Sequence, residues 1–164
     1  MTILSGKRGL IVGVAKERSA AWGIAKKASD LGAELAFTYQ IPAFEKRIAP
    51  LAESVKSDIM IPCDLSEEAA AKRAMEQLST HWSEVDFVVH AVGFSDKKEL
   101  SGAYYNTSRQ NFRQTMLISA FSFTELAQAS APIMPNGGSL LTLSYLGSVR
   151  TTPNYNVMGV AKAA

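Results

Sequence analysis

The stretch RGLIVGVAKERSAAWG, residues 8–23, decides the fold of this 164-residue chain. Residues 8–14 form a short apolar run that ends near Gly13, as expected of a buried strand. A helical pattern follows over 19–31 and closes at Gly32, with Ser19 at the position of a helix cap. A buried strand joined to a helix by a short glycine-containing loop predicts the first unit of an α/β fold.

The same alternation continues to the end of the chain. We predict further strands over 34–39, 58–62, 85–91 and 139–143, and helices over 43–56, 67–81, 107–131 and from about residue 154. Strands this apolar, alternating with helices, predict a doubly wound, Rossmann-like parallel sheet covered on both faces, in one dinucleotide-binding domain over 1–164. Because this architecture usually has six strands and only five are visible, we expect the C-terminal strands to be absent and interpret the chain as a fragment.

The helix predicted over 107–131 carries an unusually wide apolar face. Its apolar residues recur at three- and four-residue steps, at Phe112, Met116, Ala120, Phe123 and Ala127. Leu117 and Phe121 lie beside this stripe and widen it. We therefore expect burial on two sides, one of them against another subunit.

Composition excludes several classes of protein. The chain is 47% hydrophobic and 20% charged, with a net charge of +2 from scattered lysines and arginines, so we expect a globular protein without a nucleic-acid partner. A single cysteine, Cys63, fits a reducing compartment, and no signal-peptide pattern or apolar run of bilayer length is present. These features predict a cytoplasmic protein without membrane insertion. His81 and His90 form no metal-binding pattern, so we predict no metal site.

The loop between the first strand and the first helix could hold a phosphate. A pyrophosphate needs close approach of the backbone and the N-terminus of a helix, which Gly13, Ser19 and the small residues 20–21 would allow. We also expect Gly23 to let the helix pack closely on the sheet. The loop lacks the G-x-G-x-x-G pattern, however, and an ordinary strand–turn–helix corner capped by serine explains it equally well.

Three further positions follow strands at the edge where such folds bind nucleotides. Gln40 stands where an acidic residue usually binds the adenosine ribose, and an amide leaves the choice between NAD and NADP open. Asp64 either accepts a hydrogen bond from an adenine amino group or caps the next helix. Gly93 either admits the cofactor close to the backbone or makes a turn.

Tyr145 follows the fifth strand, and Tyr155 precedes Lys162 by seven residues, close to two helical turns. A lysine ammonium can hold ribose hydroxyls and lower the pKa of a nearby phenol. A phenol can donate a hydrogen bond to a carbonyl oxygen where negative charge develops. As an isolated pair, this tyrosine and lysine are better explained as ordinary surface residues.

In combination, the motifs HAVG (90–93), LLTLSYLG (140–147) and PNYNVMGVAK (153–162) carry a resemblance. From about Leu4 to Ala164 the chain resembles the NADH-dependent enoyl-[acyl-carrier-protein] reductases of bacterial type II fatty acid synthesis, within the short-chain dehydrogenase/reductase superfamily. The Tyr-x6-Lys spacing distinguishes these enzymes from the wider superfamily, which has Tyr-x-x-x-Lys; here Gly159 occupies the fourth position. Members of the family continue well past the lysine.

The resemblance implies a role for each site residue. Gly13, Ser19 and Ala20 would line the pyrophosphate and ribose, Gln40 the far ribose, Asp64 and Leu65 the adenine, and Val92 and Gly93 the adenosine end. Lys162 would hold the nicotinamide ribose, Tyr155 would bind the thioester carbonyl, and Tyr145 would help form the acyl pocket.

The implied activity is reduction of the trans-2 double bond of enoyl-acyl-carrier-protein thioesters by NADH, with NADPH open as an alternative, in a homotetramer. The rival predictions are a truncated, non-catalytic nucleotide-binding or oligomerisation module, and a different short-chain reductase that acts on a carbonyl.

Overall fold

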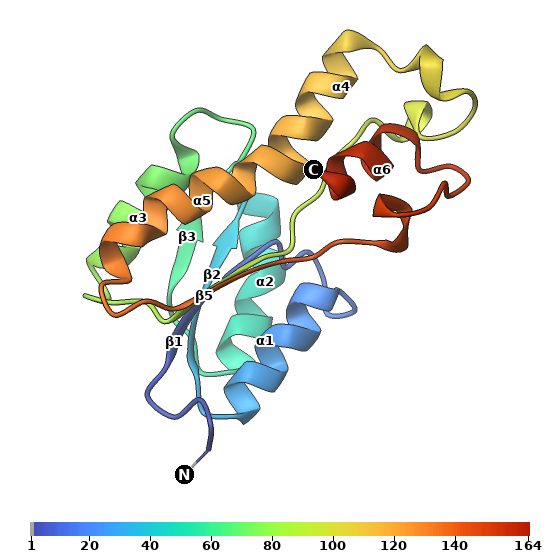
Figure 1. The fold of residues 1–164 in the computed structure, drawn as a ribbon. Helices are drawn as coiled ribbons and strands as arrows, with labels where there is room; N and C mark the ends of the chain where they lie inside the picture. Colours follow the sequence, from blue (N-terminus) through green and yellow to red (C-terminus); the bar gives the residue numbers. More distant parts are fainter. Residues whose placement is uncertain (1) are drawn as a thin grey trace.

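The computed structural model describes residues 2–164, which form a five-stranded parallel sheet in the order β3-β2-β1-β4-β5 (Figure 1). The strands are β1 (Arg8–Val12), β2 (Glu34–Tyr39), β3 (Met60–Pro62), β4 (Phe87–His90) and β5 (Ser139–Thr142). The predicted doubly wound parallel sheet is confirmed.

Helices cover both faces of the sheet. Figure 1 shows α1 (Ala20–Asp30) and α2 (Pro42–Ser54) on one side, and α3 (Ala70–Ser79) and α5 (Ser122–Ser130) on the other. Side chains alternate along β1, so that Ile11 enters the core beneath α1 and α2, whereas Leu10 and Val12 enter the core beneath α3 and α5. The apolar runs of the sequence form strands because both faces are buried.

The ends of several elements differ from the prediction. The third and fourth strands are shorter than 58–62 and 85–91, and β1 ends at Val12. Helix α2 begins at Pro42 rather than at residue 43. Proline is tolerated at the first helical position because a backbone N–H there would have no partner within the helix. Helix α3 begins at Ala70 rather than 67, after Ala69 in a left-handed conformation with φ of 58°.

The predicted helix over 107–131 is interrupted. It consists of α4 (Arg109–Met116), a π-helical turn (Leu117–Phe121) and α5. Within this chain the predicted stripe does not face the core, because Phe112, Leu117 and Phe121 are exposed and the stripe's other members are only partly buried. Burial of this side against another subunit stays a prediction. The buried residues are mostly polar: Asn111, Thr115, Ile118, Ser119, Ser122, Leu126 and Ser130.

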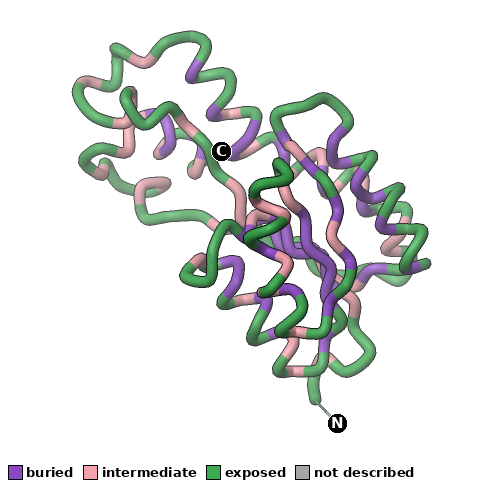
Figure 2. Tube along the Cα trace, turned by 180° about the vertical axis from the view of Figure 1, so that it is seen from behind, coloured by how far each residue is buried: buried purple, intermediate pink, exposed green. Residues whose placement is uncertain are grey.

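Helix α4 has a polar inner face because it lies beyond the sheet (Figures 1 and 2). There it packs against α6 (Asn156–Ala163). Asn111 of α4 and Ser119 of the following π-helical turn bond to the backbone of the loop after β4. An inner face that contacts backbone needs hydrogen-bonding groups.

Strand β5 also departs from the expectation of a sheet covered on both faces. It is an edge strand, and all four of its residues are exposed. Leu140 and Leu141 keep 39% and 43% of their surface accessible.

The topology places a crevice at the carboxyl edge of the sheet. Strands β1 and β4 are neighbours at the centre of the sheet. Strands β2 and β3 follow on the side of β1, and β5 lies on the side of β4, so the strand order reverses between β1 and β4. Ligands of open α/β sheets bind at such a switch point. The loops after β1 and β4 meet there, with α4 and α6 beyond them (Figure 1).

Candidate functional site at the carboxyl edge of the sheet

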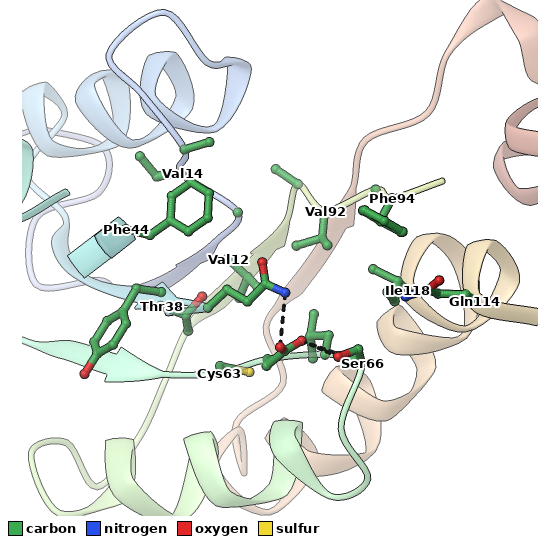
Figure 3. A pocket seen from close by; sticks show the side chains of 18 residues that line it. Val12, Val14, Thr38, Phe44, Cys63, Ser66, Val92, Phe94, Gln114 and Ile118 are labelled. Carbon is green, nitrogen blue, oxygen red and sulfur yellow. Dashed lines mark hydrogen bonds between the residues drawn. The ribbon is translucent and has the colours of Figure 1, made fainter. Parts of the chain in front are cut away.

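A cavity of about 380 Å³ opens at this edge (Figure 3). Its wall combines the residues that end or follow the first four strands with two side chains from the interrupted helix, Gln114 and Ile118. The predicted cofactor residues in the wall are Gly13, Gln40, Asp64, Leu65, Val92 and Gly93.

Gly13 lets the loop after β1 lie directly against β4. Its φ is +104°, and a Cβ atom built on it would collide with the carbonyl oxygen of Ala91. Only glycine combines this backbone conformation with this approach.

Gln40 and Asp64 are joined across the ends of β2 and β3. The Gln40 Nε2 donates to Asp64 Oδ2 at 3.1 Å, and the Ser66 backbone N–H and hydroxyl donate to Asp64 Oδ1 at 2.9 and 2.7 Å (Figure 3, dashed lines). Burial raises the pKa of Asp64, but these hydrogen bonds together lower it further, so the carboxylate is ionised. Asp64 stabilises this turn and does not cap α3, which begins at Ala70.

The loop after β4 is held by the polar face of the interrupted helix. Ser119 Oγ accepts from the Phe94 N–H at 2.9 Å and contacts the Phe94 carbonyl oxygen at 3.0 Å. Asn111 Oδ1 accepts from the Asp96 N–H at 2.8 Å. These bonds fix the backbone beside Gly93, where the cavity wall passes toward α6.

Lys162 reaches this wall from α6. Its Nζ donates to the carbonyl oxygen of Leu143 at 2.8 Å and contacts that of Val92 at 3.5 Å. A Cβ placed on Gly93 would lie 3.7 Å from the same nitrogen. Burial lowers the pKa of Lys162. The ammonium therefore stands next to the cavity, with its position set by two strand ends.

Tyr155 and Tyr145 lie against each other beside Lys162's helix. Their ring centroids are 4.8 Å apart, inclined by 60°, and a Cβ on Gly147 would lie 2.5 Å from the Tyr155 ring. Burial, followed by the proximity of Tyr145, raises the pKa of Tyr155. The expected lowering of the phenol pKa by the lysine is therefore wrong for this arrangement, and Tyr155 is a protonated hydrogen-bond donor.

Two predicted cofactor residues lie outside the cavity wall. Ser19 caps α1, accepting from the Trp22 N–H at 3.2 Å, and Ala20 is exposed in the first turn. The cap predicted at Ser19 is confirmed, while the cofactor roles of both residues stay predictions. The close packing expected at Gly23 is wrong, because open space surrounds it.

The sequence reasoning missed several wall residues. Thr38 and Phe44 flank the end of β2, and Phe94, Gln114 and Ile118 close the opposite side (Figure 3). The position of Thr38 near a strand's carboxyl end was a usable signal. Gln114 and Ile118 gave none, because the direction of α4 relative to the sheet is not encoded in local periodicity.

Cys63 is an inert part of the wall. Burial, and then the Asp64 charge, raises the pKa of its thiol to about 11.

Within residues 2–164 no three His, Cys, Asp or Glu side chains are grouped so as to hold a metal ion. None of the helices in the described range is both long and apolar enough to cross a membrane.

The arrangement suits a ligand with several polar parts. It offers close backbone approach at Gly13, an ionised carboxylate at Asp64, an ammonium at Lys162 and a phenolic donor at Tyr155. The first three fit a nucleotide, and the fourth fits a carbonyl oxygen that gains negative charge.

Comparison with known proteins gives closely similar chains. The enoyl-[acyl-carrier-protein] reductase [NADH] 2 of Rhizobium meliloti is 56% identical over 99% of this chain and 60% of its own length. The crystal structure of FabI from Candidatus Liberibacter asiaticus is 54% identical, with a TM-score of 0.97 over 100% of this chain and 64% of that one. The reductase of Anaplasma phagocytophilum, solved in complex with NAD, is 50% identical with a TM-score of 0.96, over 99% of this chain and 63% of its own.

The chain thus spans about 60% of the length of the curated relatives it matches. Residues 13–164 match the sequence model of the family described as Enoyl-(Acyl carrier protein) reductase. Since this match covers nearly the whole chain, and the fold and the Tyr-x6-Lys pair agree with it, the protein belongs to the enoyl-(acyl carrier protein) reductase family.

Proposed function

We propose that the polypeptide carrying this sequence is an NADH-dependent enoyl-acyl-carrier-protein reductase, which reduces the trans-2 double bond of enoyl thioesters in fatty acid synthesis. One observation carries the proposal: the Lys162 ammonium lies against Val92 and Gly93 at the cavity wall, and Tyr155, whose phenol is protonated, precedes the first residue of the same helix. Family membership and relatives named as NADH-dependent reductases support it.

The residues present fit a dinucleotide. Gly13 has no side chain, so the loop after β1 can lie against the residue after β4 and leave its backbone open to a ligand. Gln40 and Asp64 offer polar groups for an adenosine. Lys162 would bind the nicotinamide ribose through its ammonium. When bound, NADH supplies the hydride that the β carbon of the enoyl thioester accepts.

The chain's own residues act on the other end of the conjugated system. Reduction at the β carbon moves electron density onto the thioester oxygen, giving an enolate. Tyr155 donates a hydrogen bond to that oxygen and stabilises the developing charge, because its raised pKa keeps the proton on the phenol. Protonation at the α carbon then completes the reduction. Tyr145, whose ring lies at an inclined angle against Tyr155, would form part of the acyl pocket.

Asp64 favours NADH over NADPH in this account. An ionised carboxylate beside Gln40 repels a 2′-phosphate on the adenosine ribose more strongly than the amide alone. The Anaplasma relative was solved with NAD.

The test is an absorbance assay of the complete polypeptide with NADH or NADPH and a short trans-2-enoyl thioester. We expect oxidation of NADH, much slower oxidation of NADPH, and a saturated product. Reduction of a β-ketoacyl thioester instead would favour the carbonyl-reducing rival, whereas cofactor binding without turnover would favour the non-catalytic module.

We also propose a cytoplasmic homotetramer. The support for assembly is the exposure of three large apolar side chains along the interrupted helix, Phe112, Leu117 and Phe121. Phe121→Glu places a charge among these side chains without touching the cavity, so sedimentation should show smaller species than the unmodified protein. A Phe121→Glu protein that sediments like the unmodified one would place any subunit contact elsewhere.

A further inference from the structure

His90, the last residue of β4, is fully buried and takes no part in the proposed chemistry. Its Nδ1 lies 2.9 Å from Thr142 Oγ1 on β5, and its Nε2 lies 2.8 Å from Ser122 Oγ, the first residue after the π-helical turn. One imidazole thus bridges two strands and the interrupted helix.

The hydrogen-bond partners fix the tautomer. Ser122 Oγ donates its single proton to the Ile118 carbonyl at 2.7 Å, so it can only accept from His90. His90 Nε2 therefore carries the proton, and Nδ1 accepts from the Thr142 hydroxyl. Burial, then the charge of Lys162, lowers the pKa of His90 to about 4, so the ring is neutral.

Each end of this bridge is adjacent to a group that holds the site. Thr142 precedes Leu143, whose carbonyl accepts from Lys162 at 2.8 Å. On the other side, Ile118 precedes Ser119, which holds the Phe94 backbone. His90 itself stands two residues before Val92, the second carbonyl in contact with Lys162.

We propose that His90 is a positioning residue for Lys162: by tying β5 and the π-helical turn to β4, it sets the two carbonyls that hold the ammonium beside the cavity. The inference rests on the proposed function for its catalytic consequence, although its geometric part does not depend on NADH. A purely structural role would stabilise the fold without acting on Lys162 in particular.

The first test is the reaction rate of the Lys162 amine with an N-hydroxysuccinimide acetate, followed by mass spectrometry in the complete polypeptide. His90→Phe removes both hydrogen bonds, and Thr142→Val removes one while keeping the side chain's shape. We expect both variants to raise the labelling rate of Lys162 severalfold relative to the exposed Lys26. Val88→Ala, a fully buried change on the same strand, is the control and should leave that ratio unchanged.

The second test is a double-mutant cycle on NADH affinity. Thr142→Val should weaken NADH binding by about tenfold when Lys162 is present. In a Lys162→Ala background, the same change should alter the affinity by less than about twofold, because the group through which it acts is gone.

Equal losses in the two backgrounds, or Lys162 labelling that Thr142→Val leaves unchanged, would overturn the inference. If the unmodified protein binds no NADH, the proposed function fails, and the labelling rates alone decide the role of His90.

Discussion

Tyr155 shows how a single residue depends on its neighbours. Its ring lies on Tyr145, and the absence of a side chain at Gly147 makes room for it. The sequence placed these residues in two neighbouring motifs, 140–147 and 153–162, but could not show the contact between them. It depends on the turn after Gly147, which brings this glycine back against α6.

Gly147→Ala tests this contact. The added methyl would lie 2.5 Å from Tyr155 and 3.3 Å from Tyr145, so one ring has to move. We expect turnover of the enoyl thioester to fall by about tenfold or more, with little change in NADH affinity, because a displaced phenol no longer meets the carbonyl.

Gly23→Ala is the matched control, since nothing lies within 4 Å of its Cβ. It should leave turnover unchanged and stabilise α1 by about 0.5–1 kcal/mol. Unaltered turnover in Gly147→Ala would show that the ring position is unimportant.

His90 gives the protein a specific loss of stability in acid. Its pKa is lowered from 6.5 to about 4 in the folded state, by burial and then by the Lys162 charge. The unfolded chain therefore takes up a proton below pH 6.5 that the folded chain refuses until about pH 4. Stability due to this residue is complete above pH 6.5 and falls by about 3 kcal/mol on the way to pH 4.

Urea unfolding at several pH values measures this effect. The carboxylates also contribute to the acid dependence, so the relevant quantity is the difference between the unmodified protein and His90→Phe. The variant should have a shallower decline between pH 6.5 and pH 4. Parallel declines would mean that the buried imidazole is protonated as readily as in the unfolded chain.

At the scale of elements, the interrupted helix shows what periodicity can and cannot predict. The strands and the first three helices were predicted because they bury apolar side chains in the core of the sheet. The helix over 107–131 was predicted as an element, but the face that packs inside the chain is not the predicted apolar stripe. Apolar spacing identifies a helix face that packs on other side chains. Here, Asn111 and Ser119 bond to the backbone of a loop instead, and Thr115 bonds to the hydroxyl of Ser95 in that loop.

Asn111→Ala tests the importance of this polar face. It removes the acceptor for the Asp96 N–H and the partner of Ser95 and leaves buried polar groups unpaired. We expect a loss of stability of about 1–3 kcal/mol and weaker NADH binding, because the loop that carries Gly93 is released. Thermal unfolding and NADH titration measure the two effects. Arg109→Ala, on the exposed surface of the same helix, should change neither. A destabilised Asn111→Ala protein with unchanged NADH affinity would separate this face from the site.

The whole molecule divides its site between two parts. The sheet and the loops after β1–β4 form the cavity, and β5 with α6 contributes Lys162 and the two tyrosines. The fold and the cavity residues next to strands were predictable, because parallel strands bring their carboxyl ends to one edge. The carbonyls that hold Lys162 and the bridge through His90 were not, since both depend on contacts between segments far apart in the sequence.

The central claim is that Lys162 holds the cofactor while Tyr155 acts on the thioester. Tyr155→Phe and Lys162→Ala, compared in one set of NADH titrations and turnover assays, test it most directly. We predict that Tyr155→Phe lowers kcat by about a hundredfold with NADH affinity nearly unchanged, whereas Lys162→Ala weakens NADH binding by at least about tenfold. The account would be contradicted by a Lys162→Ala protein that binds NADH as tightly as the unmodified one, or by a Tyr155→Phe protein with undiminished kcat.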